Sequence, residues 1–481
     1  MLVQLTFYAV NIEFLKFSLI FTGVYDIMCA GDSMFTKIRL KNFRSFDNVE
    51  LDLMGKRNSP KNLAMIYGEN GSGKSNLMSA FVFLSETLAT LDVRDIYEEL
   101  LNKAALFADE NLKNMVQQRI KSGMRDIESI IEDVRMAGCN APVILEFDFQ
   151  IDGNQGQYII HLGESEIIYE RLEYLLTKRK GVYFECSNNG VSINNAVTKE
   201  KELLKDIKYA AKRFWGKHSL LAILLHEVED KSEAYAKNNL SNNLLDVLSM
   251  FIGVSSYLKI GTRKWDDSPH LVPILEDPNK GRISLSNEYR LDAAEEFFTS
   301  IFKFINKNIN KVYYKRTYND KFIDYELYFE KLIANKYRHI AFSKESTGNH
   351  QILKVLCYLL SACFGGIVIM DEMDSEIHDY LFKTILEEIY PHINGQVIMT
   401  THNTVLMETS FARDVTYIIN VDDNGHKTVN SIADYEKRTS GNNNVRSKYF
   451  SNEYGGLPTG QPKDIGDLLS RMAELLFPDN E

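Results

Sequence analysis

The chain has 481 residues, of which 44% are hydrophobic, and a formal net charge of −11 from 55 basic and 66 acidic side chains. This length exceeds one small domain, and the hydrophobic content is enough for a continuous core with an attached subdomain. The negative charge argues against a protein that coats nucleic acid, although a local basic groove stays open. The five cysteines are scattered and form no C-x-x-C pair, so they indicate a reducing, cytoplasmic setting rather than a zinc site.

Residues 1–28 are apolar and aromatic, but they do not have the pattern of a targeting segment. Glu13, Lys16 and Asp26 interrupt the run, no cationic region precedes it, and no small-residue cleavage site follows it. No stretch of the chain reaches the roughly 18 uninterrupted apolar residues of a transmembrane helix, so we expect no membrane partner. Because an alternating strand begins just after Met34, residues 1–33 are interpreted as a dispensable extension or a misplaced start.

Residues 35–94 contain a strand pair, a glycine-rich loop and a helix. Alternating polarity over residues 35–54 predicts two strands joined by a turn at 42–47. An apolar strand-like run covers residues 63–67, and a helical pattern extends from Lys74 to about Leu88. Between them stands Gly-Glu-Asn-Gly-Ser-Gly-Lys-Ser, the G-x-x-x-x-G-K-S spacing of a P-loop. Such spacing can arise by chance in a glycine-rich turn, but the flanking strand and helix favour a nucleotide site.

The residue types of this loop suit a polyphosphate. Glycines let the backbone turn tightly, so that successive N–H groups face the phosphates, and the next helix adds the positive end of its dipole. Lys74 would neutralise the outer phosphates of ATP, and Ser75 would hold Mg²⁺. The residues predicted to bind ATP in this segment are Gly68, Asn70, Gly71, Ser72, Gly73, Lys74, Ser75 and Asn76.

The middle of the chain alternates between helical and strand patterns. Apolar spacing of three and four residues predicts an inserted helical hairpin over 95–136. Short alternating runs separated by Asp-Gly, Lys-Gly and Asn-Asn-Gly predict an antiparallel meander over 137–197. Residues 198–255 turn helical, with lysines that suit a solvated face or, alternatively, a contact with DNA or a partner. Residues 256–292 lack periodicity and hold three prolines, so we expect an irregular connection there. Alternating runs resume over 312–341.

Two later apolar strands end in residues that can do chemistry. Gly-Gly-Ile-Val-Ile-Met-Asp371-Glu372 has the Walker B pattern, in which Asp371 would hold Mg²⁺ and Glu372 would polarise the water that attacks the γ-phosphate. Gln-Val-Ile-Met-Thr-Thr-His402-Asn has a polar tip with a histidine. Taken alone, the first pattern is ordinarily a buried strand that ends in solvated acids, and the histidine after the second strand is ordinarily structural. Beside a P-loop they predict a catalytic pair, with His402 as a sensor of the γ-phosphate.

A polar turn precedes the Walker B strand. The segment Ser-Lys-Glu-Ser-Thr-Gly-Asn-His-Gln, residues 343–351, leads directly into an apolar helix. It can serve simply as a helix cap, in which Ser346 or Thr347 satisfies free N–H groups. The same exposed donors at a helix N-terminus could also bind a γ-phosphate that a second subunit holds.

The order G-E-N-G-S-G-K-S, E-S-T-G-N, I-V-I-M-D-E and T-T-H-N resembles the ABC-type ATPases of the SMC, RecF and OLD group. In particular it is similar to the compact ATPases of prokaryotic phage-defence operons, such as RloA-like proteins and the AriA subunit of PARIS. The resemblance extends over most of the chain from Met34 onward. It includes Lys-Ile-Arg-Leu-Lys-Asn-Phe-Arg-Ser-Phe at 37–46, Ile-Ile-Tyr-Glu-Arg-Leu at 167–172 and the segment 444–458.

The resemblance implies an α/β fold: an ABC-type P-loop NTPase head, in which helices flank a mixed sheet, with an antiparallel β meander and helical insertions. It also implies that two heads clamp two ATP molecules in a head-to-tail dimer or larger oligomer. Ser346 and Gly348 of the signature turn would then act on the ATP of a neighbouring chain, and residues 373–378 match the family's D-loop. ATP and Mg²⁺ are the implied cofactors, and hydrolysis is expected to be slow.

The chain departs from the family pattern in two respects. The signature is Glu-Ser-Thr-Gly-Asn rather than the transporter-like Leu-Ser-Gly-Gly-Gln, which argues against a membrane transporter subunit. The Q-loop glutamine is also not fixed, since Gln150, Gln155 and Gln157 all lie in suitable territory. The stretch after His402 is too short for the nuclease domain that OLD proteins carry, so the resemblance implies a separately encoded nuclease or other toxic effector as partner.

Two other functions stay open: a RecF-like repair ATPase that acts directly on DNA, and a scaffold with a structural ATP site. The expected organisation has six parts. These are the extension 1–33, an ATPase lobe 34–94 with the P-loop, a helical insertion 95–136, a meander 137–197, a helical subdomain with an irregular connection 198–310, and a second ATPase lobe 311–481 with the signature, Walker B and switch histidine.

Overall fold

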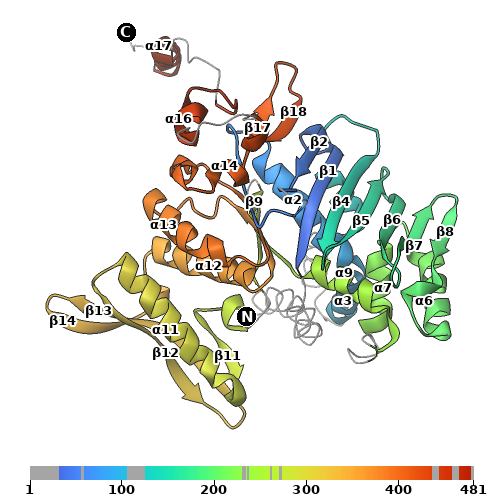
Figure 1. Ribbon diagram of the computed structural model, residues 1–481, viewed down its shortest axis with the longest axis horizontal. Coiled ribbons are helices and arrows are strands. Elements are labelled where there is room, and N and C mark those ends of the chain that lie inside the picture. The colour runs from blue at the N-terminus through green and yellow to red at the C-terminus, as the bar shows by residue number, and fades with distance from the viewer. Residues whose placement is uncertain are drawn as a thin grey trace.

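The computed structural model describes residues 32–55, 59–105, 125–229, 235, 238–260, 263–269, 273–435, 444–457 and 465–477. The predicted extension 1–33 lies outside the described residues except for its last two, and so does the middle of the predicted hairpin 95–136. Three sheets organise the described chain, with helices packed between and around them (Figure 1).

The central sheet has seven strands in the order β10-β9-β15-β16-β3-β17-β18. Its five inner strands are parallel, and the two edge strands β10 and β18 are antiparallel to their neighbours. The strands are β3 (Leu63–Tyr67), β9 (Val254–Ile260), β10 (Arg263–Asp267), β15 (Ile367–Asp371), β16 (Gln396–Thr400), β17 (Thr416–Val421) and β18 (Lys427–Ser431). Side chains of β3, β15 and β16 are buried along their whole length, which explains why these runs are continuously apolar.

Alternate side chains of these strands enter two different cores. Ala64 and Ile66 of β3 belong to the core that contains helix α2 (Lys74–Leu88), whereas Leu63, Met65 and Tyr67 belong to the core of helix α12 (Thr347–Cys363). Strand β15, which is separated from β3 by β16, divides in the same way. Because successive side chains of a strand point to opposite faces, α2 and α12 lie on opposite faces of the central sheet (Figure 1).

A second sheet of seven antiparallel strands has the order β2-β1-β4-β5-β6-β7-β8. Its strands are β1 (Ser33–Phe43), β2 (Phe46–Asp52), β4 (Val143–Ile151), β5 (Asn154–Leu162), β6 (Ile167–Leu175), β7 (Lys180–Ser187) and β8 (Gly190–Ile193). The predicted strand pair and the predicted meander are confirmed. The helices beside this sheet are α3 (Thr90–Ala105), α5 (Ile127–Val134), α6 (Lys201–Phe214), α7 (Leu220–Glu229) and α9 (Asn242–Ile252), with the short turn η3 (Asn195–Val197).

A third, four-stranded sheet packs on one long helix. Strands β11 (Lys280–Ser284), β12 (Ile309–Tyr318), β13 (Phe322–Ile333) and β14 (Lys336–Ala341) lie against α11 (Glu288–Ile305), and α10 (Pro273–Glu276) and η4 (Leu285–Asn287) are close by. The strands predicted over 312–341 are therefore confirmed. The irregular connection predicted over 256–292 is wrong, because that range contains most of β9 and all of β10 and β11. Strand β9 is fixed by pairing with β15, a contact that its own sequence does not encode.

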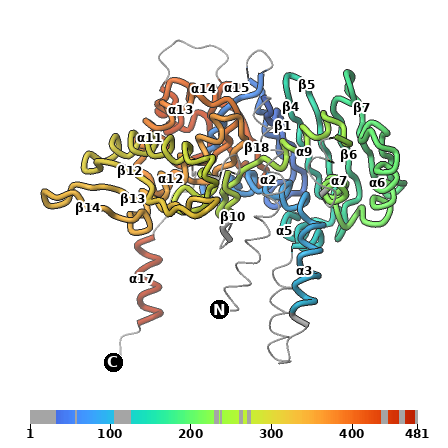
Figure 2. The backbone as a smooth tube through the Cα atoms, turned by 90° about the horizontal axis from the view of Figure 1, so that it is seen from below, coloured from blue at the N-terminus to red at the C-terminus, as the bar shows by residue number. Residues whose placement is uncertain are grey.

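The C-terminal part surrounds the α12 side of the central sheet. It contains η5 (Phe342–Lys344), α13 (Asp379–Ile389), η6 (Tyr390–His392), η7 (Thr404–Glu408), α14 (Ala412–Val415), α15 (Ile432–Tyr435), α16 (Val445–Phe450) and α17 (Ile465–Leu476). Every residue of α17 is exposed, and the helix stands off from the rest of the chain (Figure 2). Among the residues that the structure describes, none of the helices combines the length and hydropathy needed to span a bilayer.

Glu170 of β6 is a fully buried carboxylate that holds the start of α7. It accepts hydrogen bonds from the Tyr158 hydroxyl at 3.0 Å, the Trp215 indole N–H at 3.0 Å and the Leu220 backbone N–H at 2.7 Å. Burial nevertheless raises the pKa of Glu170 from 4.5 to about 7, since these donors offset only part of the lost hydration. The folded protein therefore binds a proton at Glu170 more tightly than the unfolded chain does.

We expect Glu170→Gln to change how stability depends on pH. Because the folded pKa is raised, the stabilising effect of the proton is complete below about pH 4.5 and is lost as the pH rises through about 7. Over this window the wild-type free energy of unfolding should fall by up to about 3 kcal/mol relative to the variant. Urea titrations at pH 5 and pH 8, followed by tryptophan fluorescence, measure this difference. Parallel pH profiles for the two proteins would contradict it.

Candidate nucleotide-binding site

The P-loop connects the end of β3 to the start of α2, as the sequence predicts. Gly71 and Gly73 have φ values of 82° and 106°, which favour glycine, and a Cβ atom at Gly73 would come within 2.8 Å of the Phe46 ring. Helix α2 begins at Lys74 and ends at Leu88, the predicted bounds. Its N-terminus therefore faces the loop at the carboxyl edge of the central sheet, where α/β proteins bind nucleotides.

Lys74 is directed into its own loop. Its ammonium group donates to the carbonyl oxygens of Gly68 at 3.0 Å and Glu69 at 3.2 Å, and the side chain is buried. Burial lowers the pKa of Lys74, an effect opposed by the carboxylates of Glu372, Asp371 and Glu69. A cation held by two carbonyl groups can exchange them for anionic phosphate oxygens, which are stronger acceptors.

Asp371 ends β15 beside the loop and is buried. Its carboxylate accepts hydrogen bonds from the Thr400 hydroxyl at 2.6 Å and from the Ser75 hydroxyl. Burial raises the pKa of Asp371, and these two hydrogen bonds oppose the change. Strand pairing explains the contact between Asp371 and Thr400, because β15 and β16 are parallel neighbours with these two residues opposite each other. The structure thus brings the two predicted Mg²⁺ ligands, Ser75 and Asp371, into contact.

Glu372 and His402 are in hydrogen-bond contact at the same edge. The His402 Nε2 atom lies 3.1 Å from a Glu372 carboxylate oxygen, and both side chains are partly exposed. This hydrogen bond lowers the pKa of Glu372. Glu372 has a left-handed backbone with φ 49°, rare for a residue other than glycine, and its N–H donates to the Thr400 carbonyl and hydroxyl oxygens at 3.2 and 3.1 Å. Thr400 therefore positions both acids of the Walker B motif.

A further layer of hydrogen bonds, which the sequence did not single out, links these strand ends. The Tyr67 hydroxyl donates to the Asn403 carbonyl oxygen at 2.9 Å, so the strand before the P-loop holds the segment after His402. The Thr401 hydroxyl donates to Asp374, and the Gln351 side chain donates to the Met373 carbonyl oxygen at 2.6 Å. In the sequence, the signal for these contacts is a polar side chain at or next to the end of an apolar strand, as at Tyr67 and Thr401. Its partner cannot be read from the sequence, because it depends on which strands are neighbours.

The signature turn begins helix α12, on the face of the central sheet opposite α2. Ser346 is the N-cap of α12, where its hydroxyl accepts from the Asn349 N–H at 3.3 Å, so the predicted capping role is confirmed. Ser346 is exposed, and a Cβ atom at Gly348 would lie 3.4 Å from the Glu376 carbonyl oxygen in the predicted D-loop.

The residues fit the predicted cofactors. The Ser72 hydroxyl oxygen is buried and has no hydrogen-bond partner among the described residues, which suits a loop that receives an acceptor-rich ligand. The hydroxyl of Ser75 and the carboxylate of Asp371 are the hard oxygen donors that Mg²⁺ prefers. Asn76 instead donates to the Ser45 hydroxyl at 2.8 Å, and Gln157 donates to Asp148 at 2.8 Å. The Q-loop glutamine stays open among Gln150, Gln155 and Gln157.

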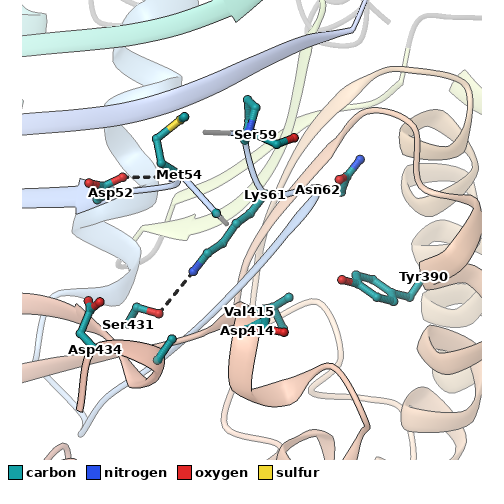
Figure 3. A pocket seen from close by; sticks show the side chains of 13 residues that line it. Asp52, Met54, Ser59, Lys61, Asn62, Tyr390, Asp414, Val415, Ser431 and Asp434 are labelled. Atoms are coloured by element: carbon teal, nitrogen blue, oxygen red, sulfur yellow. Dashed lines mark hydrogen bonds between the residues drawn. The ribbon is translucent and has the colours of Figure 1, made fainter. Parts of the chain in front are cut away.

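A cavity of about 570 Å³ lies at the opposite end of β3 (Figure 3). Its lining includes Lys61 and Asn62, which precede β3, together with Tyr390, Asp414 and Ser431. Lys61 donates to the Ser431 hydroxyl at 3.3 Å and lies over the Tyr417 ring. The cavity therefore does not belong to the P-loop site, which is at the other end of the strand.

The parallel sheet, the P-loop and the adjoining strand ends define a P-loop ATPase, and the predicted α/β fold class is confirmed. The family described as "AAA domain, putative AbiEii toxin, Type IV TA system" matches residues 63–408, from the start of β3 to the end of η7. The chain belongs to this family.

Two curated relatives match parts of the chain. DNA replication and repair protein RecF of Shewanella sediminis is 24% identical over 259 residues, which cover 50% of this chain and 64% of RecF. Chromosome partition protein Smc of Methanocaldococcus jannaschii is 48% identical over 48 residues, which cover 10% of this chain and 4% of Smc. The chain thus spans less than two thirds of the length of either relative.

Solved structures of SMC heads are also similar. The SMC head domain from Thermotoga maritima has 15% sequence identity and a TM-score of 0.34, and the alignment covers 83% of this chain and 98% of that one. An SMC head bound to the C-winged helix domain of ScpA has 14% identity and a TM-score of 0.39, with 82% and 97% covered. At these TM-scores the likeness adds nothing to the fold, which rests on the strand order above.

Proposed function

We propose that this protein binds and slowly hydrolyses ATP as the sensor, regulator or scaffold of a prokaryotic anti-phage defence system, and that it controls a separate toxic effector. The observation that supports ATP hydrolysis most is the contact between Glu372 and His402. Glu372 directly follows Asp371, whose carboxylate is hydrogen-bonded to Ser75. The candidate general base, Glu372, thus lies beside the candidate Mg²⁺ ligands, Asp371 and Ser75, at one edge of the central sheet.

Each residue has a role that follows from its position. Lys74 and the N–H groups at the start of α2 bind the outer phosphates, and Ser75 and Asp371 hold Mg²⁺, which supplies neutralising charge. Glu372 has a lowered pKa and is therefore ionised, so it can accept a proton from the attacking water. His402 orients the Glu372 carboxylate through their hydrogen bond, and in this proposal it would also sense the γ-phosphate.

Hydrolysis in this proposal needs a second copy of the chain. Ser346 and Gly348 begin a helix on the face of the sheet opposite α2, and Ser346 is exposed. In a head-to-tail dimer or larger oligomer, the signature turn of one chain would meet the ATP held by the P-loop of the next. An isolated monomer should therefore bind ATP but hydrolyse it poorly.

The defence role is supported by the family description, which names the AbiEii toxin and type IV toxin–antitoxin systems. It is also supported by the resemblance to RloA-like proteins and to AriA. In this proposal the protein works in the cytoplasm, a phage product or altered DNA is the trigger, and the effector is a nuclease or another toxin encoded separately.

Co-expression of the chain with the product of the neighbouring gene tests the defence role. We expect the two proteins to co-purify in a ratio that changes between ATP and ADP, and cells that carry both genes to resist phage. Resistance should disappear with Lys74→Ala. Phage protection by the ATPase gene alone, or protection that survives Lys74→Ala, would overturn the proposal.

The match to RecF favours a second candidate, an ATPase that acts directly on DNA. That function predicts tight DNA binding by the isolated chain, with an affinity that falls steeply as salt rises because phosphate contacts release counterions. Fluorescence anisotropy with labelled DNA at two or more salt concentrations measures this slope. Binding that is weak and insensitive to ATP would exclude the second candidate.

A further inference from the structure

The β17–β18 hairpin lies beside the P-loop. Strand β17 is the parallel neighbour of β3, and β18 returns from it with Lys427 paired to Val421 at the carboxyl edge of the sheet. A Cβ atom at Gly68 would lie 3.2 Å from Ile419, so the hairpin packs directly against the start of the loop. The hairpin belongs to the C-terminal part of the chain, more than 300 residues from the P-loop.

Lys427 reaches from this hairpin to the loop. Its ammonium group donates to the Gly71 carbonyl oxygen at 3.3 Å and lies 5.5 Å from the centre of the Phe46 ring. Phe46 is buried under Gly73, and the next residue, Asp47, binds His426 at 2.7 Å. Burial lowers the pKa of Lys427, and the nearby Glu69 carboxylate opposes this. The side chain is therefore held between the hairpin and the β1–β2 turn.

Lys427 contacts the carbonyl oxygen of the Gly71–Ser72 peptide group, and the N–H of that peptide group points away from Lys427. In a planar trans peptide, the carbonyl and N–H groups point in opposite directions. The Gly71 carbonyl points to Lys427, and the Ser72 N–H of the same peptide donates to the Glu69 carbonyl oxygen at 3.2 Å. Lys74 donates to that same Glu69 oxygen. The Glu69 carbonyl oxygen thus accepts hydrogen bonds from the Ser72 N–H and the Lys74 ammonium, the two donors that a bound phosphate oxygen would use.

We infer that Lys427 is a positioning residue of the nucleotide site: it holds the Gly71–Ser72 peptide from outside, so that the Ser72 N–H points into the loop. The inference rests on the proposed binding of ATP. It adds a residue of the β17–β18 hairpin, which none of the predicted motifs contains. Since Lys427 acts through the loop backbone, it affects any nucleotide whose β-phosphate the loop holds, and it affects binding rather than the hydrolytic step.

Lys427→Met, Lys427→Arg and Lys61→Met test this inference in the full chain. Lys61, which precedes β3, is a matched control, because it is also a half-buried lysine that donates a 3.3 Å hydrogen bond and lies over an aromatic ring, but its contacts are with the far end of the hairpin, at Ser431 and Tyr417. We expect Lys427→Met to raise the Kd of both ATP and ADP about tenfold, the value of one hydrogen bond to a charged group. Arginine should restore affinity, and Lys61→Met should leave it unchanged.

Three further measurements separate positioning from a general structural effect. The thermal midpoint of the nucleotide-free Lys427→Met variant should equal that of wild type, and its kcat at saturating ATP should be unchanged. Unaltered Kd values, a failure of arginine to restore binding, or a loss confined to ATP would overturn the inference. If wild type and Lys74→Ala bind ATP equally, the proposed function fails instead, whatever Lys427→Met does.

Discussion

Glu372→Gln should lower the rate of ATP hydrolysis at least about a hundredfold and leave ATP binding intact. The amide keeps the shape of the side chain and can still contact His402, which lies 3.1 Å from the carboxylate, but it cannot accept the proton of the attacking water. Lys74, Ser75 and Asp371 are unchanged, so the nucleotide should bind as before. The ATP-bound assembly should therefore accumulate.

Phosphate release and size-exclusion chromatography in ATP measure these two effects. The matched control is Glu388→Gln, which changes an exposed glutamate on α13 beyond the Walker B strand. The control should hydrolyse ATP at the wild-type rate and should not retain the ATP-bound oligomer. Unchanged turnover by Glu372→Gln would remove Glu372 from the role of catalytic base and would leave its hydrogen bond with His402 as a structural contact.

Lys74→Ala should raise the Kd of ATP more than about a hundredfold, because the cation that would meet the phosphates is lost from a site that also holds three carboxylates. The Lys74 ammonium lies among the Gly68 and Glu69 carbonyl oxygens and the carboxylates of Glu69, Asp371 and Glu372. Isothermal titration with ATP and Mg²⁺ measures the loss. An undiminished affinity would remove the nucleotide site altogether.

Mixing Lys74→Ala with Ser346→Arg tests whether the signature acts in trans. Each variant alone should be inactive in hydrolysis. In a mixed dimer, one composite site combines the intact P-loop of one chain with the intact signature of the other. Random mixing should then restore about a quarter of wild-type activity, because half of the dimers carry one good site of two. If the mixture stays inactive while the Ser346→Arg chain still binds ATP, the trans role is wrong.

Local sequence was sufficient where local chemistry decides the structure. The P-loop helix begins and ends at the predicted residues, because a glycine-rich turn and an apolar period fix it without help from the rest of the chain. The meander followed from alternating runs and glycine turns in the same way. Strand β9 was missed, since its Ser255, Ser256 and Lys259 break the apolar run and only the neighbouring β15 makes it a strand.

The side-by-side order of parallel strands was the main feature that the sequence could not supply. Thr400 meets Asp371, and Tyr67 meets Asn403, because β16 lies between β15 and β3. Lys427 meets the P-loop because β17 takes the other side of β3. Motif spacing identified the ends of these strands as chemical sites, whereas the contacts among them depend on a lateral order that no single segment contains.

The two-sided packing of β3 also restricts how this protein can change during evolution. Adding or removing one residue in β3 would turn Ala64 and Ile66 toward α12, and Leu63, Met65 and Tyr67 toward α2, so both cores would be mismatched at once. A change of two residues would keep the faces but would move the P-loop about 7 Å relative to Asp371 and His402. Substitutions can accumulate in this strand, but its length between Asn62 and Gly68 is fixed, and alignments of relatives should be free of gaps there.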